Sequence, residues 1–249
     1  MSKFAMGWIY LRFHGCLNDF LPVTQREQTI NYWVKEKTAL KHIIETVGVP
    51  HPEVGYAEVN GHPQPLCYHV QDGDDIHVYP FTLNGSDALT LDPRFVLDNH
   101  LGKLTHYLRL LGFDALYDPN WQDRDLALIA NREDRILLTR DRGLLKRNLV
   151  RRGYCVRAHN PRDQVFEIIR RFNLKHLVNP FQRCPRCNGL LESVNKQEIL
   201  DRLEPLTQLY YDEFDRCTQC GQIYWKGSHY ERMLPFIEKV LNYCNGDSL

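Results

Sequence analysis

Residues 135–142 read Arg-Ile-Leu-Leu-Thr-Arg-Asp-Arg, an apolar run that ends in a threonine and an acid. A second run, Phe95-Val-Leu97, ends in Asp98 in the same way. Short apolar runs bounded by polar residues are typical of buried strands. The segments between them predict helices and a further strand at Leu101–Leu111, Phe113–Tyr117 and Trp121–Asn131. Strands that alternate with helices of this length predict an α/β domain with a parallel sheet flanked by helices.

The same alternation continues beyond Asp141. A helix is expected from Gly143 to Arg151, a strand from Tyr154 to Arg157 and a helix from Pro161 to Phe172. We therefore place this domain at residues 93–175. The segment 142–152 carries five positive charges. As a helix it would bind a phosphate backbone or form a solvated face, and the sequence leaves both open.

Acidic residues follow the predicted strands. Asp98 and Asp141 come at strand ends, and Asp123 and Asp125 begin a predicted helix, where a carboxylate can also serve as a cap. The carboxyl ends of parallel strands meet at one edge of a sheet, so these acids are expected to converge. Converging carboxylates repel one another unless a cation binds them, and Mg²⁺ or Mn²⁺ prefers such oxygen ligands.

The first 81 residues predict a different domain. Strands at 4–13 and 29–34, a helix at 38–47 and short strands at 57–59, 66–70 and 76–79 resemble the β-grasp fold of ubiquitin-like sulfur carriers. Those carriers end in Gly-Gly, which is missing here, so their thiocarboxylate chemistry is not expected. We expect this α+β domain to bind a protein partner or to pack on its neighbour, and residues 82–92 to form a linker.

The four paired cysteines carry the most specific motif. Cys184-x-x-Cys187 and Cys217-x-x-Cys220 supply four thiolates, the set that structural Zn²⁺ prefers, whereas the other cysteines are single. A zinc ribbon is therefore predicted within residues 180–249, with a helical insertion at 198–206 and a C-terminal helix. Nearby Trp225 and His229 could stack on a base or take part in catalysis, but packing roles are favoured.

Charge is distributed unevenly along the 249 residues. Residues 90–183 carry 18 Lys and Arg against 11 Asp and Glu, whereas both flanking segments are acidic. A basic centre indicates a polyanionic partner such as RNA. The phosphate contacts we expect near the acidic edge are Lys103, Arg109, Arg140 and Arg142. No apolar run is long enough to cross a membrane, so we expect no membrane partner and a cytoplasmic location.

The stretch from Arg94 to Asn148, above all Leu-Leu-Thr-Arg-Asp-Arg at 137–142, resembles the PIN-type ribonuclease domain found at the C-terminus of the Mut-seven exonucleases. The resemblance extends into the zinc ribbon, and bacterial members often carry an N-terminal ubiquitin-like domain. It implies that Asp98, Asp123 and Asp141 are catalytic metal ligands for hydrolysis of RNA phosphodiesters. No motif fixes a fourth acid, for which Asp114 and Asp118 are guesses. The alternative is an RNA-binding or adaptor protein with a degenerate PIN site.

Overall fold

The structure, a computed structural model, describes residues 7–82 and 93–243. Two compact units make up the chain. One combines Met1–Asn84 with Asp123–Cys155, and the other combines Gly85–Gln122 with Val156–Leu249. The three domains predicted from the sequence are each one continuous stretch, whereas each compact unit combines two separate stretches. The predicted domain boundaries stay predictions. Most of the predicted linker lies outside the described residues.

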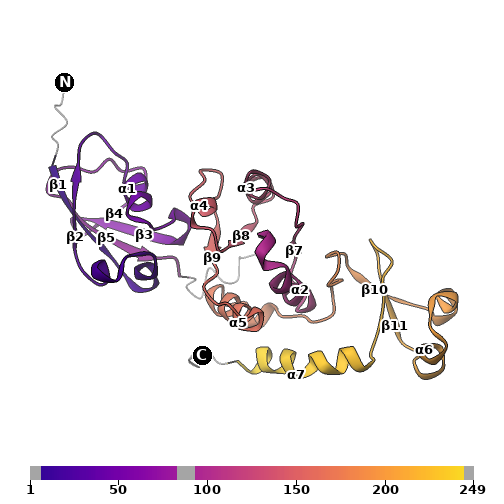
Figure 1. The fold of residues 1–249 in the computed structure, drawn as a ribbon. Coiled ribbons are helices and arrows are strands. Elements are labelled where there is room, and N and C mark those ends of the chain that lie inside the picture. The colour runs from indigo at the N-terminus through magenta and orange to yellow at the C-terminus, as the bar shows by residue number, and fades with distance from the viewer. Residues whose placement is uncertain (1–6, 83–92, 244–249) are drawn as a thin grey trace. The chain divides into compact units, whose positions relative to one another are not determined.

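The N-terminal part of the first unit is a β-grasp domain (Figure 1). Its sheet has the order β2-β1-β5-β3-β4, in which β1 and β5 are parallel and the other neighbours antiparallel. Helix α1 (Leu40–Val47) buries Leu40, Ile43 and Ile44. The strands and 3₁₀ turns are β1 (Gly7–Phe13), η1 (Gly15–Phe20), η2 (Val23–Gln25), β2 (Ile30–Val34), η3 (His51–Glu53), β3 (Val54–Val59), β4 (His62–Gln64) and β5 (Asp75–Pro80).

The strand predicted at 66–70 is wrong. Only an isolated bridge, Ala39 to His69, forms there. The carbonyls of Leu66 and Tyr68 instead accept hydrogen bonds from the first two backbone N–H groups of α1, at 2.8 Å each. The first N–H groups of a helix have no partner within it, so this segment serves as a cap for α1 rather than as a strand.

The first unit also contains residues Asp123–Cys155. This segment comprises α3 (Asp123–Arg132), β8 (Ile136–Thr139), α4 (Arg142–Leu145) and β9 (Gly153–Cys155). Strands β8 and β9 are parallel, and every residue of both is buried. Gly153 permits this close packing, because a Cβ there would lie 2.7 Å from the Leu145 side chain. A buried parallel pair connected by a helix agrees with the predicted α/β class.

The helix predicted from Gly143 to Arg151 is wrong in length, since α4 ends at Leu145. Contacts with the β-grasp domain account for the difference. The Lys146 ammonium donates to the carbonyl of Glu45 at 2.6 Å, and the buried Val150 offers its carbonyl to His51 at 2.8 Å. These contacts override local helix propensity. The five charges of 142–152 therefore do not lie on one helix.

The β-grasp domain packs on residues 141–155 within the first unit. Glu53 is completely buried, and its Oε1 accepts the backbone N–H of Cys155 at 2.7 Å. The Arg142 guanidinium donates to the carbonyl of Phe20 at 3.1 Å and lies over the Phe20 ring, 5.0 Å from its centroid. Of the two roles expected for this domain, the structure therefore shows packing on a neighbour.

The second unit holds another parallel pair. Strand β6 (Phe95–Leu97) pairs with β7 (Ala115–Leu116), and α2 (Gly102–Leu110) connects them. Helix α5 (Pro161–Arg171) packs against α2. The 3₁₀ turns η5 (Asn99–Leu101) and η6 (Lys175–Leu177) follow β6 and α5. The two parallel pairs and their helices confirm the predicted α/β fold class.

A small ribbon and a long helix complete the second unit. The antiparallel sheet has the order β10-β11-β12, with β10 (Leu191–Val194), β11 (Phe214–Cys217) and β12 (Ile223–Trp225). Helix α7 spans Ser228–Asn242, as a C-terminal helix was predicted. Among the described residues, no helix is long and apolar enough to span a membrane.

The continuous helix predicted at 198–206 is wrong. Two 3₁₀ turns, η7 (Lys196–Glu198) and η8 (Leu200–Arg202), precede a short helix, α6 (Pro205–Tyr210). Proline has no backbone N–H to donate, so Pro205 favours the start of a helix and disfavours its interior. Ile199 and Leu203 of this insertion pack in the ribbon's own hydrophobic core.

Candidate functional site

The four paired cysteines form a cluster in the ribbon. Their sulfur atoms all lie within 4.8 Å of one another, with Cys184 Sγ 3.7 Å from Cys220 Sγ and Cys187 Sγ 3.3 Å from Cys217 Sγ. A tetrahedral Zn²⁺ with bonds of about 2.3 Å sets its sulfur ligands about 3.8 Å apart. Both the ligand chemistry and the spacing therefore fit one structural zinc ion. Four protein ligands leave no open coordination position for catalysis.

Backbone turns aim these thiols at a common point. Cys184 accepts the N–H of Asn188 at 2.9 Å and donates its own N–H to Gly189 at 2.7 Å. Gly189 is required at that turn, because a Cβ would lie 2.8 Å from Cys217 Sγ. Burial raises the pKa of the Cys187 thiol to about 12. A cation that binds thiolate would offset this cost of burial.

Arg109 joins the first cysteine knuckle to α2. The residue is only 5% exposed, and its guanidinium donates to the carbonyls of Ala115 (2.8 Å), Pro185 (3.3 Å) and Arg186 (2.9 Å). Pro185 and Arg186 lie between the first two cysteines. Arg109 was predicted to bind phosphate, whereas in the structure its guanidinium donates to the protein's own backbone. The carbonyls of Pro185 and Arg186 lie over 70 residues away along the chain, so these two contacts leave no signal in the sequence.

Asn188 makes a second connection to the same knuckle. Its side chain accepts the N–H of Ala115 at 3.0 Å and donates to Asp114 Oδ1 at 2.8 Å. Arg183 lies 3.6 Å from the other Asp114 oxygen. Asp114, one of the guesses for a fourth acid, is thus used to hold the ribbon. Asn188 has a positive φ of 75°, and an Asn-Gly pair such as Asn188-Gly189 is a general sequence signal for a turn, which the prediction did not use here.

Asp98 and Asp141 each follow a buried strand. Asp98 is 6% exposed and follows β6 in the second unit. Asp141 follows β8 in the first unit, and its Oδ1 accepts the N–H groups of Gly143 (2.6 Å) and Leu144 (3.4 Å). Its own N–H donates to the Thr139 hydroxyl at 2.9 Å. Asp141 Oδ2 has no hydrogen bond to the residues that the structure describes.

The other acids lie at the starts of a helix and a turn. Asp123 and Asp125 are in the first turn of α3, and Asp123 Oδ2 lies 3.3 Å from the Arg147 guanidinium. Asp118, the second guess for a fourth acid, accepts the N–H of Asn120 at 2.9 Å within a turn.

Two of the four predicted phosphate contacts are on the surface in the expected way. Lys103 on α2 and Arg140 after β8 are both exposed. Arg142 is exposed too, although its guanidinium also contacts the backbone of η1, at Phe20 and at Asp19 (3.4 Å). All three side chains are exposed, whereas Arg109 is buried.

Comparisons with known proteins identify the family. Residues 93–237 match the model of the Mut7-C RNAse domain, and residues 6–85 match that of the Mut7-C ubiquitin domain. No curated protein matches the chain. Among solved structures, the solution structure of the Haloferax volcanii HVO 2177 protein is 14% identical, over 34% of this chain and 98% of that chain, with a TM-score of 0.26.

The first family match covers more than half of the chain, including both parallel strand pairs and the cysteine cluster. The second covers the β-grasp domain. The resemblance found in the sequence is thereby confirmed. The protein belongs to the Mut7-C RNAse domain family, a ribonuclease-type family, and carries the family's ubiquitin-like domain at its N-terminal end.

Proposed function

We propose that this protein is a divalent-metal-dependent ribonuclease that hydrolyses RNA phosphodiester bonds. Asp98, Asp123 and Asp141 are the proposed ligands of Mg²⁺ or Mn²⁺, and the four cysteines hold a structural Zn²⁺. The family match supports the ribonuclease class. Carboxylate oxygens are the ligands these hard cations prefer. When bound, the cation would activate water and offset the negative charge that develops on the phosphate oxygens.

The geometry of Asp141 carries the proposal. Two backbone N–H groups hold one carboxylate oxygen in place, and the other oxygen has no partner among the described residues. Asp98 likewise follows a buried strand. Because Asp98 belongs to the other compact unit, the meeting of the three acids is itself part of the proposal.

Cations at the surface would hold the flanking phosphates. We assign this role to Lys103, Arg140 and Arg142, which are exposed. Such contacts position RNA without reading its sequence. Arg109 is left out of this set because its guanidinium is buried against backbone carbonyls.

A cleavage assay tests the proposal. Labelled single-stranded and structured RNAs are incubated with the zinc-loaded full chain, with and without added Mn²⁺ or Mg²⁺. We expect cleavage only with the added cation and its loss in Asp98→Asn and Asp141→Asn, while RNA binding is retained. The matched control is Asp134→Asn, an exposed acid paired with Arg152, which should cleave normally. Cleavage unchanged in Asp141→Asn contradicts the assignment.

One observation favours the alternative of a non-catalytic RNA-binding protein. Asp123 is already paired with Arg147 at 3.3 Å, so a cation must compete with this guanidinium. Under that alternative, RNA binds but is not cut with any divalent cation. The variant Arg147→Ala separates the two cases, because freeing Asp123 increases cleavage in an enzyme and changes nothing in an adaptor.

The ubiquitin-like domain is the proposed site of a protein partner. Its exposed aromatic residues Trp8, Tyr10, Trp33 and Tyr56, each 41–50% exposed, support such an interface. We place the protein in the cytoplasm, where a reducing environment keeps cysteines available to zinc.

A further inference from the structure

A cavity of about 620 Å³ opens in the second unit, where the C-terminal end of α2, strand β12 and the start of α7 meet. Its lining combines aromatic rings with cationic side chains. None of the three proposed catalytic acids and none of the four cysteines lines it. The volume falls within the range of about 300–1,000 Å³ that is typical of small-ligand sites.

Aromatic rings form part of the cavity wall. Phe181 and Tyr230 stack with their centroids 4.6 Å apart and their planes 30° apart. Trp225 is 38% exposed, although the rings of Tyr211 and Phe214 each lie 6.3 Å away. A large ring that keeps over a third of its surface exposed in a cavity offers a face on which a planar ligand can stack.

Phe181 is held in a backbone conformation that a bulky residue rarely adopts. Its φ is +63°, in the left-handed region. The N–H groups of Phe181 and Asn179 donate to the carbonyls of Leu110 and Leu111, each at 3.0 Å, and so fix the segment on the end of α2. Strain of this kind is concentrated at ligand sites, where the surrounding structure enforces it. Here it places an aromatic ring in the cavity wall.

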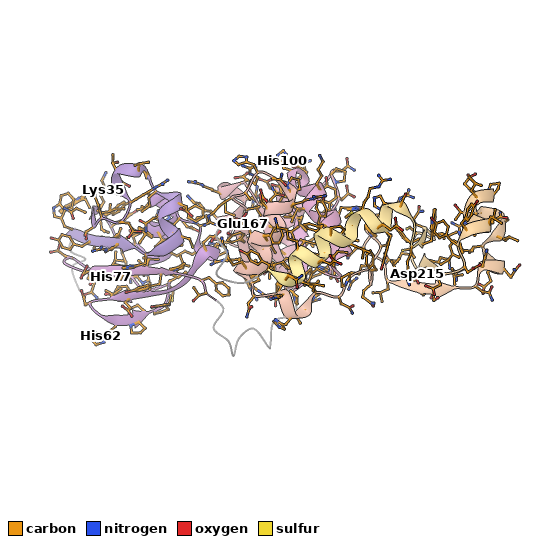
Figure 2. The ribbon with its side chains drawn as sticks, turned by 90° about the horizontal axis from the view of Figure 1, so that it is seen from below. Lys35, His62, His77, His100, Glu167 and Asp215 are labelled. Atoms are coloured by element: carbon orange, nitrogen blue, oxygen red, sulfur yellow. The ribbon has the colours of Figure 1, made fainter. Side chains whose placement is uncertain are left out.

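Cationic side chains also line the cavity. Arg186 is exposed and contacts the Gln222 side chain at 3.5 Å, and Lys226 pairs with Glu213 at 2.7 Å. Arg183, which pairs with Asp114, also lines the cavity. Asp215 on β11, labelled in Figure 2, is the acidic residue of the lining. Lys226 and Arg183 are already paired with carboxylates, so Arg186 is the lining cation that has no ion pair among the described residues. Arg186 beside the aromatic rings favours a ligand that has a planar, weakly polar body and a negative charge.

We propose that this cavity binds an unpaired nucleotide of single-stranded RNA. The base stacks on Trp225 and against the Phe181–Tyr230 pair, and Arg186 binds the adjacent phosphate. Stacking on aromatic side chains joined to a basic surface is how proteins bind single strands without sequence preference. This inference rests on the proposed function in that RNA is the substrate. It adds a second binding site, in the ribbon, that would select unpaired over paired RNA.

The test measures binding of the zinc-loaded full chain to a fluorescein-labelled uridine hexamer by anisotropy, without added Mg²⁺ or Mn²⁺. We expect Trp225→Ala and Phe181→Leu to weaken binding about tenfold. The matched control is Tyr210→Ala, an exposed aromatic residue (71%) at the end of α6 that does not line the cavity. It should change the affinity less than twofold. Zinc content and the unfolding midpoint of each variant establish that the ribbon is folded. If Trp225→Ala does not fold, Trp225→Leu replaces it in the binding measurement.

Two further measurements separate stacking from charge. Arg186→Ala should lower the slope of log affinity against log salt by about 0.7, the loss of one phosphate contact on a single strand. A duplex of the same length should bind with equal affinity to wild type and Trp225→Ala. The proposal is overturned if the hexamer binds wild type, Trp225→Ala and Phe181→Leu with equal affinity. It is also overturned if Trp225→Ala loses as much affinity for the duplex as for the hexamer. These binding measurements do not depend on cleavage. The nuclease assignment can therefore fail while this binding site is confirmed, and this binding site can fail while the nuclease assignment is confirmed.

Discussion

The guanidinium of Arg109 donates a hydrogen bond to the carbonyl of Arg186, 2.9 Å away, and so connects helix α2 to the turn between the first two cysteines of the metal cluster. Asn188 reinforces this connection through Ala115. The ribbon is therefore connected to the segment that follows β6, the strand that comes directly before Asp98. We infer that loss of zinc loosens this part of the second unit as well as the ribbon.

Replacement of Arg109 tests its structural role. Arg109→Ala leaves three backbone carbonyls without their donor in a buried place, and we expect the free energy of unfolding to fall by at least about 2 kcal/mol. Chemical denaturation measures this change. Lys103→Ala, on the exposed side of the same helix, is the control: it should change stability by less than about 0.5 kcal/mol and weaken RNA binding instead. Wild-type stability in Arg109→Ala, together with weaker RNA binding, would show that the original assignment to phosphate contact was right.

Removal of zinc should destabilise the second unit. We expect the purified protein to contain one zinc ion, and Cys184→Ser to lose it along with part of the thermal stability, because structural zinc contributes directly to folding. Elemental analysis and thermal unfolding measure the two effects. Cys67→Ser, an exposed single cysteine, should retain both the zinc and the melting temperature. Zinc that persists in Cys184→Ser is incompatible with the four-cysteine site.

The buried carboxylate of Glu53 should stabilise the contact between the β-grasp domain and β9. Glu53→Ala removes the carboxylate oxygen that accepts the N–H of Cys155, and we expect a loss of about 2 kcal/mol in denaturant unfolding. Glu53→Gln, which keeps an acceptor, should recover part of this loss. The exposed Glu36→Ala should be neutral. Equal stability of all three variants would mean that this contact contributes nothing to the first unit.

A histidine pair gives the β-grasp domain a pH dependence. His14 Nε2 lies 2.9 Å from His77 Nδ1, a bond that needs one donor and one acceptor. Burial and the neighbouring His77 lower the pKa of His14 below its ordinary 6.5. The unfolded chain therefore binds this proton more readily, and stability present above pH 6.5 is lost as the pH falls through the lower, folded value.

The pair also lies beside charged residues, Arg12, Glu27 and Glu58, which act on His14 in both directions. We expect an NMR titration to place the pKa of His14 below 6.5, and His77→Gln to move it upward. The pH dependence of unfolding between pH 7 and 5 should become shallower in His14→Gln. A His14 pKa above 6.5 would refute this prediction.

Local patterns were enough to predict most of the architecture. The apolar runs at β6 and β8, the helical spacing of α1 and the two Cys-x-x-Cys turns each record their structure within a few residues. Where prediction failed, the cause was a distant contact. Helix α4 ends early because Lys146 and Val150 bind the β-grasp domain, and residues 66–70 cap α1 instead of forming a strand.

The candidate site likewise has features that the sequence predicts and features that it does not. The cysteine cluster could be read from spacing alone, since two close pairs supply a complete ligand set. The role of Arg109 could not be predicted, because an arginine that binds phosphate and an arginine that binds a remote carbonyl look alike in a sequence. The left-handed backbone of Phe181 was also invisible, since the residue is neither glycine nor asparagine. The joint placement of Asp98, Asp123 and Asp141 stays a prediction.

Binding of Mn²⁺ to the zinc-loaded full chain, measured by calorimetry with and without a non-cleavable RNA analogue, tests that prediction most directly. The proposed site predicts uptake of Mn²⁺ by the wild type and by the control Asp134→Asn, and its loss in Asp98→Asn and Asp141→Asn. Folded, zinc-loaded protein that takes up no Mn²⁺ or Mg²⁺ even with RNA bound, or uptake that survives both substitutions, would contradict a catalytic metal site built from these aspartates.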